Sequence, residues 1–337
     1  MQIVLHRYTL KLRHYFKIAR DERSEQPTLI VELKDGETSG YGEATTNTYY
    51  GISYQNMAEC LEKVNQKLEN YTFYTPAQLW EDMKDYFGGN PFAQCALDEA
   101  AYDFYGKKIG KPLYQIWGLH LANMPQTNYT IGIDSVEKMA EKLKEMPWDL
   151  YKIKLGTPHD IEIVKELRKH TNATFRVDAN CGWTAEETIR NSHELKKLGV
   201  EFIEQPMKAD AWEDMKEVFA HSALPVIADE SCIVASDVSK CFGYFHGINI
   251  KLMKCGGLTP ALQMIREARS LNMKLMMGCM TESSVGISAI AHIAPMLDYV
   301  DMDGPMLISN DIAEGVILTR EKAVFPERNG IGAKLRA

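Results

Sequence analysis

The sequence predicts a two-domain α/β protein, in which an α+β amino-terminal domain precedes a modified (β/α)7β barrel of the TIM type. The main observation is a regular series of polar clusters, each closing an apolar run of strand length. The clusters are Lys152/Lys154, Asp178/Asn180, Glu204, Asp229, Lys251 and Asp301/Asp303. Counted from Lys154, the first five follow one another at intervals of 24, 26, 25 and 22 residues, which is the length of one strand plus one helix. The length of 337 residues also exceeds what one small core usually holds.

The amino-terminal third of the chain has a different pattern. Two segments that alternate apolar and polar side chains precede three segments with apolar side chains at helical spacing. These segments are residues 3–12 and 28–36, and then residues 57–71, 76–87 and 91–110. We expect two antiparallel strands, joined by a polar loop over residues 17–26, and three helices. Together they predict an α+β capping domain over residues 1–118, completed by the tail over residues 310–337.

Between residues 119 and 309 a strand followed by a helix repeats along the chain. Eight segments are predicted as the strands of the barrel. They cover residues 128–134, 151–156, 175–180, 201–206, 225–230, 248–253, 274–279 and 299–304. The helices between them carry end signals; in one, Thr184 and Glu187 form a capping box and Gly199 ends the helix. Because barrel strands present their carboxyl ends on one rim, the polar clusters predict an active site there.

Lys152 and Lys154 alternate with apolar residues in the second barrel strand. One face of a barrel strand meets the helices and the other points inward, so we expect Ile153 and Leu155 outward and the lysines toward the barrel axis. A buried ammonium group is unfavourable unless a carboxylate or a functional charge compensates it. The acids at the neighbouring strand ends, together with Lys251, therefore favour a charged site over a strand whose polar face simply meets water.

Asp178, Glu204 and Asp229 close three consecutive strands. Carboxylate oxygens from separate elements are the ligands that Mg²⁺ prefers, and the absence of His and Cys from this set disfavours zinc. We expect one Mg²⁺ per subunit at these three residues. Asn180 and Glu230 lie next to the proposed ligands, and they either support them through hydrogen bonds or serve only as a turn residue and a helix cap.

The composition limits the class of partner. With 38 basic and 46 acidic residues the net charge is −8, and no long basic block occurs, which argues against nucleic acid or an anionic membrane as partner. Seven cysteines without a CxxC pair are typical of reduced thiols, and no segment is long and apolar enough to span a bilayer. We expect a cytoplasmic protein, a homo-oligomer, that acts on a small molecule.

Seven motifs follow one another over nearly the whole chain. They are CALDEAAYDFYGKKIGKPLYQIWG, KIK, DAN, EQP, ADES, INIKLMKCGG and NGIGAKL. In these motifs the chain resembles the muconate lactonizing subgroup of the enolase superfamily. The resemblance implies that Asp178, Glu204 and Asp229 bind Mg²⁺. The mandelate racemase branch of that superfamily is excluded, because it needs a histidine after the seventh strand, where this chain has Gly278 and Cys279.

The resemblance also implies a role for each lysine. Lys154 and Lys251 would form the acid/base pair on opposite faces of the substrate, and Lys152 would assist as an electrostatic partner of the substrate carboxylate and of Lys154. Removing a proton next to a carboxylate gives an enediolate, whose charge a divalent cation stabilises. A lysine base must be partly neutral, and we expect Mg²⁺ and the second ammonium group to lower its pKa. Two bases on opposite faces imply 1,1-proton transfer with inversion.

Other parts of the resemblance imply the substrate contacts. Asp301 and Asp303 lie on one face of the eighth strand, as in the dipeptide epimerases, where this pair binds the α-ammonium group of the dipeptide. In the predicted polar loop, Arg23 matches the arginine that binds the glutamate side chain in alanine–glutamate epimerases, and Arg20 is a second candidate. Further residues expected at the pocket are Tyr50, Met280, Glu282 and Ser284.

The predicted function is Mg²⁺-dependent inversion of the α-carbon of the carboxyl-terminal residue of a dipeptide. L-Ala-D-Glu and L-Ala-L-Glu are the expected pair, with recycling of cell-wall (murein) peptide as the expected role. One alternative is a cycloisomerase or o-succinylbenzoate synthase of the same subgroup, which the anionic Asp301/Asp303 pair disfavours because those substrates carry no ammonium group. Another alternative is a non-catalytic metal-binding scaffold, which the presence of both Lys154 and Lys251 disfavours.

Overall fold

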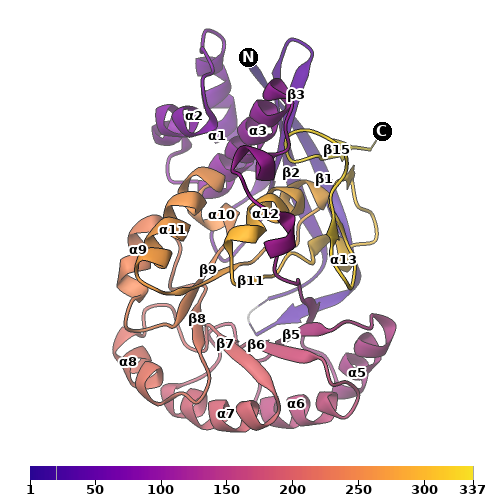
Figure 1. Ribbon diagram of the computed structural model, residues 1–337, viewed down its shortest axis with the longest axis vertical. Coiled ribbons are helices and arrows are strands. Elements are labelled where there is room, and N and C mark those ends of the chain that lie inside the picture. Colours follow the sequence, from indigo (N-terminus) through magenta and orange to yellow (C-terminus); the bar gives the residue numbers. More distant parts are fainter. Residues whose placement is uncertain (20, 337) are drawn as a thin grey trace.

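A computed structural model describes residues 1–19 and 21–336 of the chain (Figure 1). It contains an α+β capping domain and a curved sheet of eight parallel strands surrounded by helices, which confirms the predicted fold class. In Figure 1 the capping domain lies above the barrel, and both labelled ends of the chain lie on the capping-domain side. The interface between the two parts therefore lies near the middle of the molecule.

The capping domain contains a three-stranded antiparallel sheet and three main helices. Its elements are β1 (Gln2–Ile18), β2 (Asp21–Asp35), β3 (Thr38–Thr45), α1 (Tyr54–Leu68), α2 (Pro76–Met83), the 3-10 turn η1 (Lys84–Phe87) and α3 (Pro91–Ile109). Helix α3 packs closely on β3, because Gly42 has no side chain: a Cβ there would lie 2.1 Å from the carbonyl oxygen of Ala96. This close approach buries α3 between the sheet and the barrel.

The prediction of a polar loop over residues 17–26 is wrong. β1 and β2 continue as a hairpin in which Lys17 pairs with Glu22 and Ile18 pairs with Asp21. Side chains of a hairpin alternate between two faces, so a polar sequence can form strands when one face meets solvent and the backbones pair with each other. The hairpin extends the capping domain toward the barrel, where Figure 1 shows it beside the strand ends.

The barrel sheet contains eight parallel strands in sequence order. They are β4 (Tyr129–Ile131), β5 (Leu150–Lys154), β6 (Thr174–Asp178), β7 (Val200–Glu204), β8 (Val226–Ala228), β9 (Gly247–Ile250), β10 (Lys274–Met277) and β11 (Tyr299–Val300). A parallel bridge between Thr127, just before β4, and Val300 of β11 joins the first strand to the last. Thr127 also accepts a 2.8 Å hydrogen bond from Trp148 Nε1 at its carbonyl oxygen, which holds the junction in place.

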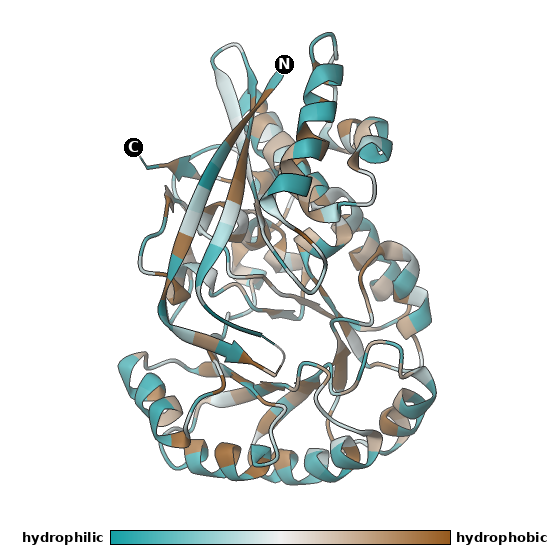
Figure 2. Cartoon of the chain, turned by 180° about the vertical axis from the view of Figure 1, so that it is seen from behind, coloured by the Kyte–Doolittle hydropathy of each residue, from teal (hydrophilic) through white to brown (hydrophobic). Residues whose placement is uncertain are grey.

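Helices alternate with these strands on the outside of the barrel. They are α5 (Val136–Glu145), α6 (Asp160–Arg168), α7 (Ala185–Lys197), α8 (Trp212–His221), α9 (Ala235–Cys241), α10 (Leu252–Cys255), α11 (Leu258–Ser270), α12 (Ser284–Ile293), η3 (Ala294–Met296) and α13 (Gly304–Leu307). Figure 2 shows broad hydrophilic stretches on the outer helices and largely hydrophobic strands inside them. Helix α7 begins with the capping box of Thr184 and Glu187, and Gly199 follows it with φ +73°, as the sequence predicts.

The carboxyl-terminal tail lies against the capping domain. Short elements occupy the linker and the tail: α4 (Leu113–Ile116), η2 (Leu121–Asn123), β12 (Ala313–Glu314), β13 (Ile317–Leu318), β14 (Ala323–Val324) and β15 (Lys334–Leu335). The buried carboxylate of Asp103 on α3 accepts hydrogen bonds from the backbone amides of Tyr41 (2.8 Å) and Ile331 (2.9 Å). One side chain thus joins β3, α3 and the tail.

A second buried carboxylate joins the capping domain to the barrel. Glu43 on β3 accepts hydrogen bonds from the backbone amides of Ser283 (3.1 Å) and Gly286 (3.0 Å), which are orphan donors at the amino terminus of α12. The Ser283 hydroxyl donates to the same carboxylate at 2.6 Å. A carboxylate at a helix amino terminus also interacts favourably with the helix dipole. Glu43 therefore fixes the position of β3, and of the loop that follows it, above the barrel rim.

Two further expectations concern membranes and thiols. Among the described residues, no helix is long and apolar enough to cross a membrane. All seven cysteines lie in the described part of the chain, and each has a free thiol. Four of them are buried, namely Cys95, Cys232, Cys241 and Cys255.

His292 on α12 makes the stability of this fold depend on pH. His292 is 1% exposed, and its Nδ1 accepts a hydrogen bond from the backbone N–H of Tyr114 at 3.2 Å. The His292 ring stacks on Tyr114 and meets Phe325 edge to face. Burial lowers the pKa of His292 to about 4. The unfolded chain binds a proton near the ordinary pKa of 6.5, so stability is fully present above that pH and is lost as the pH falls toward 4. The contribution of His292 to the free energy of unfolding should fall by about 2 kcal/mol between pH 7.5 and pH 5.

Urea denaturation at these two pH values tests the effect. His292→Gln keeps a hydrogen-bond acceptor but cannot titrate, so its free energy of unfolding should fall by about 2 kcal/mol less than that of the wild type. His221→Gln, at an exposed position on α8, is the matched control and should behave as the wild type does. Equal pH dependence in the wild type and in His292→Gln would contradict the assignment.

Candidate active site

A cavity of about 440 Å³ lies at the carboxyl-terminal rim of the barrel, between the strand ends and the capping domain. Its charged wall comes from the barrel: Lys152, Lys154, Lys251, Asp301 and Asp303. Its opposite wall comes from the β1–β2 hairpin and the loop after β3: Phe16, Ile18, Asp21, Arg23, Tyr49 and Tyr50. The cavity therefore needs both domains.

Three carboxylates converge at the barrel rim. Asp178 and Glu204 are the last residues of β6 and β7, and Asp229 follows β8 directly. One carboxylate oxygen of each lies within 4.8 Å of the others, and all three side chains are buried. The register of the sheet produces this arrangement, because Asp178 pairs with Lys154 of β5 on one side and with Glu204 on the other.

The three carboxylates differ in proton affinity. Burial raises the pKa of Glu204 to about 7, and the charge of Asp178 adds to the rise. Burial acts in the same direction on Asp178, but the ammonium groups of Lys154 and Lys152 outweigh it and lower the pKa to about 2. The pKa of Asp229 also lies well below its usual range, since Lys251 and Lys254 outweigh the effect of burial. An additional cation at the cluster would favour the ionised form of Glu204.

The lysines flank this cluster. Lys154 Nζ lies 2.7 Å from Asp178 Oδ2, at the β6 side, and Lys251 Nζ lies 2.7 Å from Asp229 Oδ2, at the β8 side. Because the strands are in sequence order, the two amines approach the carboxylates from opposite ends of the series. Lys152 lies deeper, with Nζ 2.7 Å from Glu204 and 2.9 Å from Asp301.

Carboxylates around the lysines stabilise their charged forms. Burial lowers the pKa of Lys152, but Asp301, Glu204 and Asp178 outweigh it and raise the pKa well above the usual value. The pKa of Lys251 is also raised, chiefly by Asp229, against the effect of burial. The expectation that Mg²⁺ lowers the pKa of a lysine base stays a prediction, because it requires the cation to take up the charge of these carboxylates.

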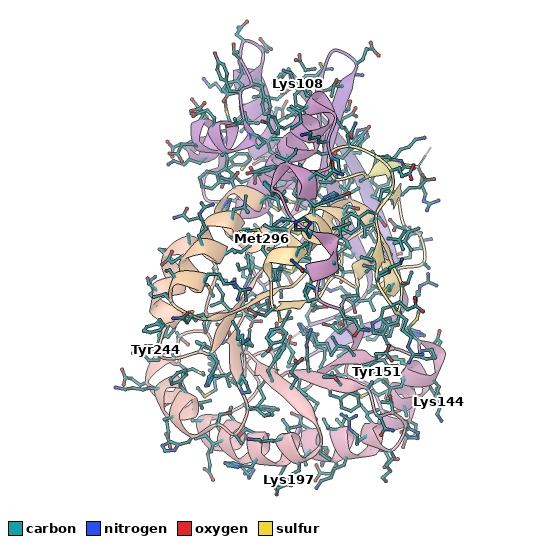
Figure 3. The ribbon with its side chains drawn as sticks, viewed as in Figure 1. Lys108, Lys144, Tyr151, Lys197, Tyr244 and Met296 are labelled. Carbon is teal, nitrogen blue, oxygen red and sulfur yellow. The ribbon has the colours of Figure 1, made fainter. Side chains whose placement is uncertain are left out.

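The donor set fits a hard divalent cation. It consists of three carboxylates from three strands, with no nitrogen or sulfur ligand among them, and their oxygens already converge to one place. Lysines on the outside of the barrel differ from those at the cluster: Lys144 and Lys197 lie on the exposed outer helices, where Figure 3 labels them at the edge of the molecule. Among the described residues, the buried lysines are Lys152, Lys154 and Lys254, and all three contact the acids at the barrel rim.

Lys254 is a member of the site that the sequence prediction missed. Its side chain is fully buried, and Nζ donates to Asp229 Oδ1 at 2.6 Å and to the Asp229 carbonyl oxygen at 2.5 Å. The carbonyl oxygens of Cys232 (3.0 Å) and Asn249 (3.3 Å) complete its contacts. Lys254 thus fixes one oxygen of Asp229 while the other faces Lys251. Its spacing of three residues from Lys251, in INIKLMKCGG, was the available signal.

Asn249 also contributes, because its Nδ2 donates to Glu204 Oε1 at 2.7 Å and orients that carboxylate. Asn180 lines the cavity with φ +45°, and its backbone N–H donates to Asp178 Oδ1 at 2.9 Å. Glu230 is buried and adds to the raised pKa of Lys251. The supporting roles expected for Asn180 and Glu230 stay predictions.

Asp301 and Asp303 both line the cavity, just after β11, with different partners. Asp301 accepts hydrogen bonds from Lys152 at 2.9 Å and from Asn128 at 2.7 Å. Asp303 accepts the backbone amide of Thr130 at 2.6 Å. Burial and the neighbouring Asp301 raise the pKa of Asp303 to about 8. A cationic group bound here would contact Asp301, which is already paired with Lys152, and Asp303. The positive charge of that group would lower the pKa of Asp303 and favour its ionised form.

Only some of the residues expected at the pocket line the cavity. Arg23, Tyr50 and Met280 line the cavity, whereas Arg20 lies outside the described residues. The structure does not bring Ser284 to the cavity, because it is the first residue of α12 and its hydroxyl donates to Asp311 of the tail at 2.5 Å. Thr281 lines the wall instead.

Glu282 lies behind the wall, where its Oε1 accepts the Met280 amide at 2.7 Å. Burial, with Glu43 nearby, raises the pKa of Glu282 to about 8. We interpret Glu282 as a residue that shapes the loop carrying Met280, without lining the cavity itself.

Comparison with known protein families matches both parts of the chain. Residues 2–118 match the mandelate racemase / muconate lactonizing enzyme, N-terminal domain, and residues 134–337 match the enolase C-terminal domain-like family. The chain is 57% identical over 335 residues to the L-Ala-D/L-amino acid epimerase of Flavobacterium johnsoniae, covering 99% of this chain and 100% of that protein. It is 40% identical to the L-Ala-D/L-Glu epimerase of Bacteroides thetaiotaomicron, covering 98% and 87%.

Solved structures agree with these relatives. A substrate-liganded L-Ala-D/L-Glu epimerase from Bacillus subtilis superposes with a TM-score of 0.93 and 28% identity, covering 99% of this chain and 98% of that chain. A dipeptide epimerase from Cytophaga hutchinsonii, complexed with Mg and the dipeptide D-Ala-L-Val, superposes with a TM-score of 0.94 and 27% identity, covering 100% and 96%.

Glu204→Gln tests the proposed cation site. The variant removes a central charge from the cluster, so Mg²⁺ affinity measured by isothermal titration calorimetry should fall by at least about tenfold. Glu201→Gln is the control, since Glu201 lies toward the other end of β7 and pairs with Arg176 at 2.8 Å. Circular dichroism establishes that both variants fold. Unchanged Mg²⁺ affinity in folded Glu204→Gln would exclude Glu204 as a ligand.

Proposed function

The chain belongs to the mandelate racemase and muconate lactonizing enzyme family of the enolase superfamily, and from this premise we propose that it is a Mg²⁺-dependent dipeptide epimerase. The enzyme inverts the α-carbon of the carboxyl-terminal residue of the dipeptide. The observation that carries this proposal is the pair Lys154 and Lys251, which line one cavity and contact a buried cluster of three carboxylates from opposite ends. Two amines on two sides of a carbon are what inversion by proton transfer requires.

Asp178, Glu204 and Asp229 are the residues that would hold Mg²⁺. The bound cation supplies electrostatic stabilisation of the negative charge that develops on the substrate carboxylate when the α-proton leaves. Lys152 adds a further positive charge from deeper in the site, where its Nζ lies 2.7 Å from Glu204 and 2.9 Å from Asp301. Its role is electrostatic and not that of a base.

Lys154 and Lys251 move the proton. In one direction the neutral amine of one lysine removes the α-proton, and the ammonium group of the other donates a proton to the opposite face. The reverse direction exchanges the two roles, so one lysine must be neutral and the other charged at the start of each turnover. Lys254 supports this arrangement by holding Asp229, which in turn contacts Lys251.

Asp301 and Asp303 receive the α-ammonium group of the dipeptide. Both acids line the cavity beside Lys152 and Thr130, so a dipeptide bound here by its ammonium group could extend its carboxyl-terminal residue toward the carboxylate cluster. An anionic pair is unfavourable for the substrates of cycloisomerases and o-succinylbenzoate synthases, which carry no ammonium group. A non-catalytic scaffold would have no need for two buried lysines beside the metal ligands.

The substrate class is L-Ala-D/L-amino acid dipeptides, with L-Ala-D-Glu and L-Ala-L-Glu among them. The relative at 57% identity is named for amino acids in general, whereas the relative at 40% identity is named for glutamate, which supports a class broader than glutamate alone. As a further part of the proposal, we expect the protein to be a cytoplasmic homo-oligomer that processes peptides derived from the cell wall.

Hydrogen exchange tests the activity. Each member of a dipeptide library is incubated with the enzyme and Mg²⁺ in D₂O, and the deuterium at each α-carbon is measured by NMR. We expect uptake at the carboxyl-terminal residue, accompanied by formation of the second epimer. No uptake from any dipeptide would reject the proposal and favour a cycloisomerase or synthase.

Single lysine variants separate the two bases. Lys154→Ala and Lys251→Ala should each lower epimerisation by about 10³-fold, because each removes one partner in the proton transfer. Each variant should still exchange the α-proton of one epimer, namely the epimer whose α-proton points toward the remaining lysine. Lys144→Ala, on the outer helix α5, is the control and should retain wild-type turnover. Wild-type turnover by Lys154→Ala would overturn its assignment as a base.

Asp303→Asn tests the ammonium contact. The variant keeps the shape of the side chain but removes a charge that pairs with the substrate, so KM should rise by about tenfold while Mg²⁺ affinity stays the same. Asp298→Asn, before β11 and paired with Arg269, provides a control with an unchanged KM. A wild-type KM in Asp303→Asn would exclude this contact.

A further inference from the structure

We propose that Asp21 sets the breadth of substrate specificity by neutralising Arg23 in the cavity wall. The wall then presents a neutral ion pair to the side chain of the carboxyl-terminal residue, so uncharged and acidic side chains are accepted with similar efficiency. This inference rests on the proposed epimerase function. It adds Asp21 as a specificity-determining residue, which acts by moderating the charge of Arg23.

The contacts of Arg23 carry the inference. Its Nη2 donates to Asp21 Oδ2 and its Nη1 donates to Gln26 Oε1. Gln26 is itself fixed, because it is 1% exposed and its Nε2 donates to the carbonyl oxygens of Pro27 (3.0 Å) and Thr46 (2.9 Å). The guanidinium group is therefore held from two sides before any substrate arrives, and one of these partners is a carboxylate.

Both members of the pair face the cavity. Asp21 and Arg23 are two residues apart on β2, so their side chains lie on the same face of the strand, and both line the cavity. Their side chains are only 32% and 26% exposed, respectively. Glu22 lies between them on the other face of the strand, where its carboxylate is 3.7 Å from Lys17 Nζ. The hairpin thus directs one of two adjacent acids to the cavity and the other away from it.

The surroundings of the Asp21–Arg23 pair further reduce discrimination between acidic and uncharged substrate side chains. Phe16, Ile18 and Leu307 form an apolar wall beside it. An apolar substrate side chain can pack on this wall without breaking the ion pair. A glutamate side chain must compete with Asp21 for the same guanidinium N–H donors and lies near a second negative charge. The attraction to Arg23 and the repulsion from Asp21 then largely cancel.

Two isosteric dipeptides measure this cancellation. L-Ala-L-Glu and L-Ala-L-Gln differ in charge but hardly in shape, and the ratio of their kcat/KM values should lie within about threefold of one for the wild type. Asp21→Asn uncovers the charge of Arg23, so the ratio should rise by about tenfold in favour of glutamate, through KM and not kcat. Asp21→Glu keeps the negative charge, so its ratio should equal that of the wild type.

Arg23→Gln is the reciprocal variant. It leaves Asp21 uncovered, so the ratio should fall by about tenfold, and L-Ala-L-Lys should become a better substrate. Adding Arg23→Gln to Asp21→Asn should cancel the gain for glutamate. Glu22→Gln makes the same charge change on the opposite face of β2, and it should leave the ratio at the wild-type value.

The outcomes separate this inference from the proposed function. If the wild type epimerises no dipeptide, the proposed function fails. If it epimerises dipeptides but Asp21→Asn and Glu22→Gln change the ratio equally, or neither changes it, the inference about Asp21 alone is wrong. A change in kcat with unchanged KM in Asp21→Asn would likewise contradict it, because that result indicates a structural effect on catalysis.

Discussion

The central physical constraint of this molecule is charge balance in a buried place. Asp178, Glu204 and Asp229 bring three carboxylate oxygens within 4.8 Å of one another, which is costly away from water unless cations compensate. Ammonium groups of lysines provide part of that compensation, at distances of 2.6–2.7 Å from Asp178 and Asp229. Because each charge stabilises the others, the cluster is a set of mutually dependent groups that also leaves room for one more cation.

The barrel supplies the geometry that this balance requires. The parallel strands of the barrel all end on one rim, so the residues at their carboxyl ends lie close together. Small residues leave the necessary space: a Cβ at Gly278 would lie 2.8 Å from Asn249 Nδ2 and 3.2 Å from Lys251 Cε. Gly278 therefore allows Lys251 to extend toward Asp229. A large side chain at this position, directly after β10, would therefore displace the lysine.

The sequence was sufficient to predict whatever depends on strand periodicity. Lys152 and Lys154 alternate with apolar residues, and Asp178, Glu204 and Asp229 follow at the spacing of strand plus helix, so their common rim follows from the repeat alone. The continuation of the capping hairpin through residues 17–26 was not predictable in this way, because its polar residues resemble a loop until the partner strand is known. The expectation that Ser284 lines the cavity did not hold for a related reason. Its position within the first turn of α12 decides whether its side chain faces the cavity or the tail, and it faces the tail.

Lys254 shows most clearly where periodicity stops being informative. It lies on α10, a single turn that begins after Lys251, and its fully buried ammonium group is satisfied mainly by carbonyl oxygens and by Asp229. Its spacing of three residues from Lys251 marks it as a candidate but does not predict the contact with Asp229, because that contact depends on how the loop after β8 and the turn after β9 fold against each other. Sequence patterns thus identify residues that elements deliver to a site, whereas residues that hold those elements in place are found from the packing. In this enzyme the two kinds of residue meet on one carboxylate, Asp229, with Lys251 at one oxygen and Lys254 at the other.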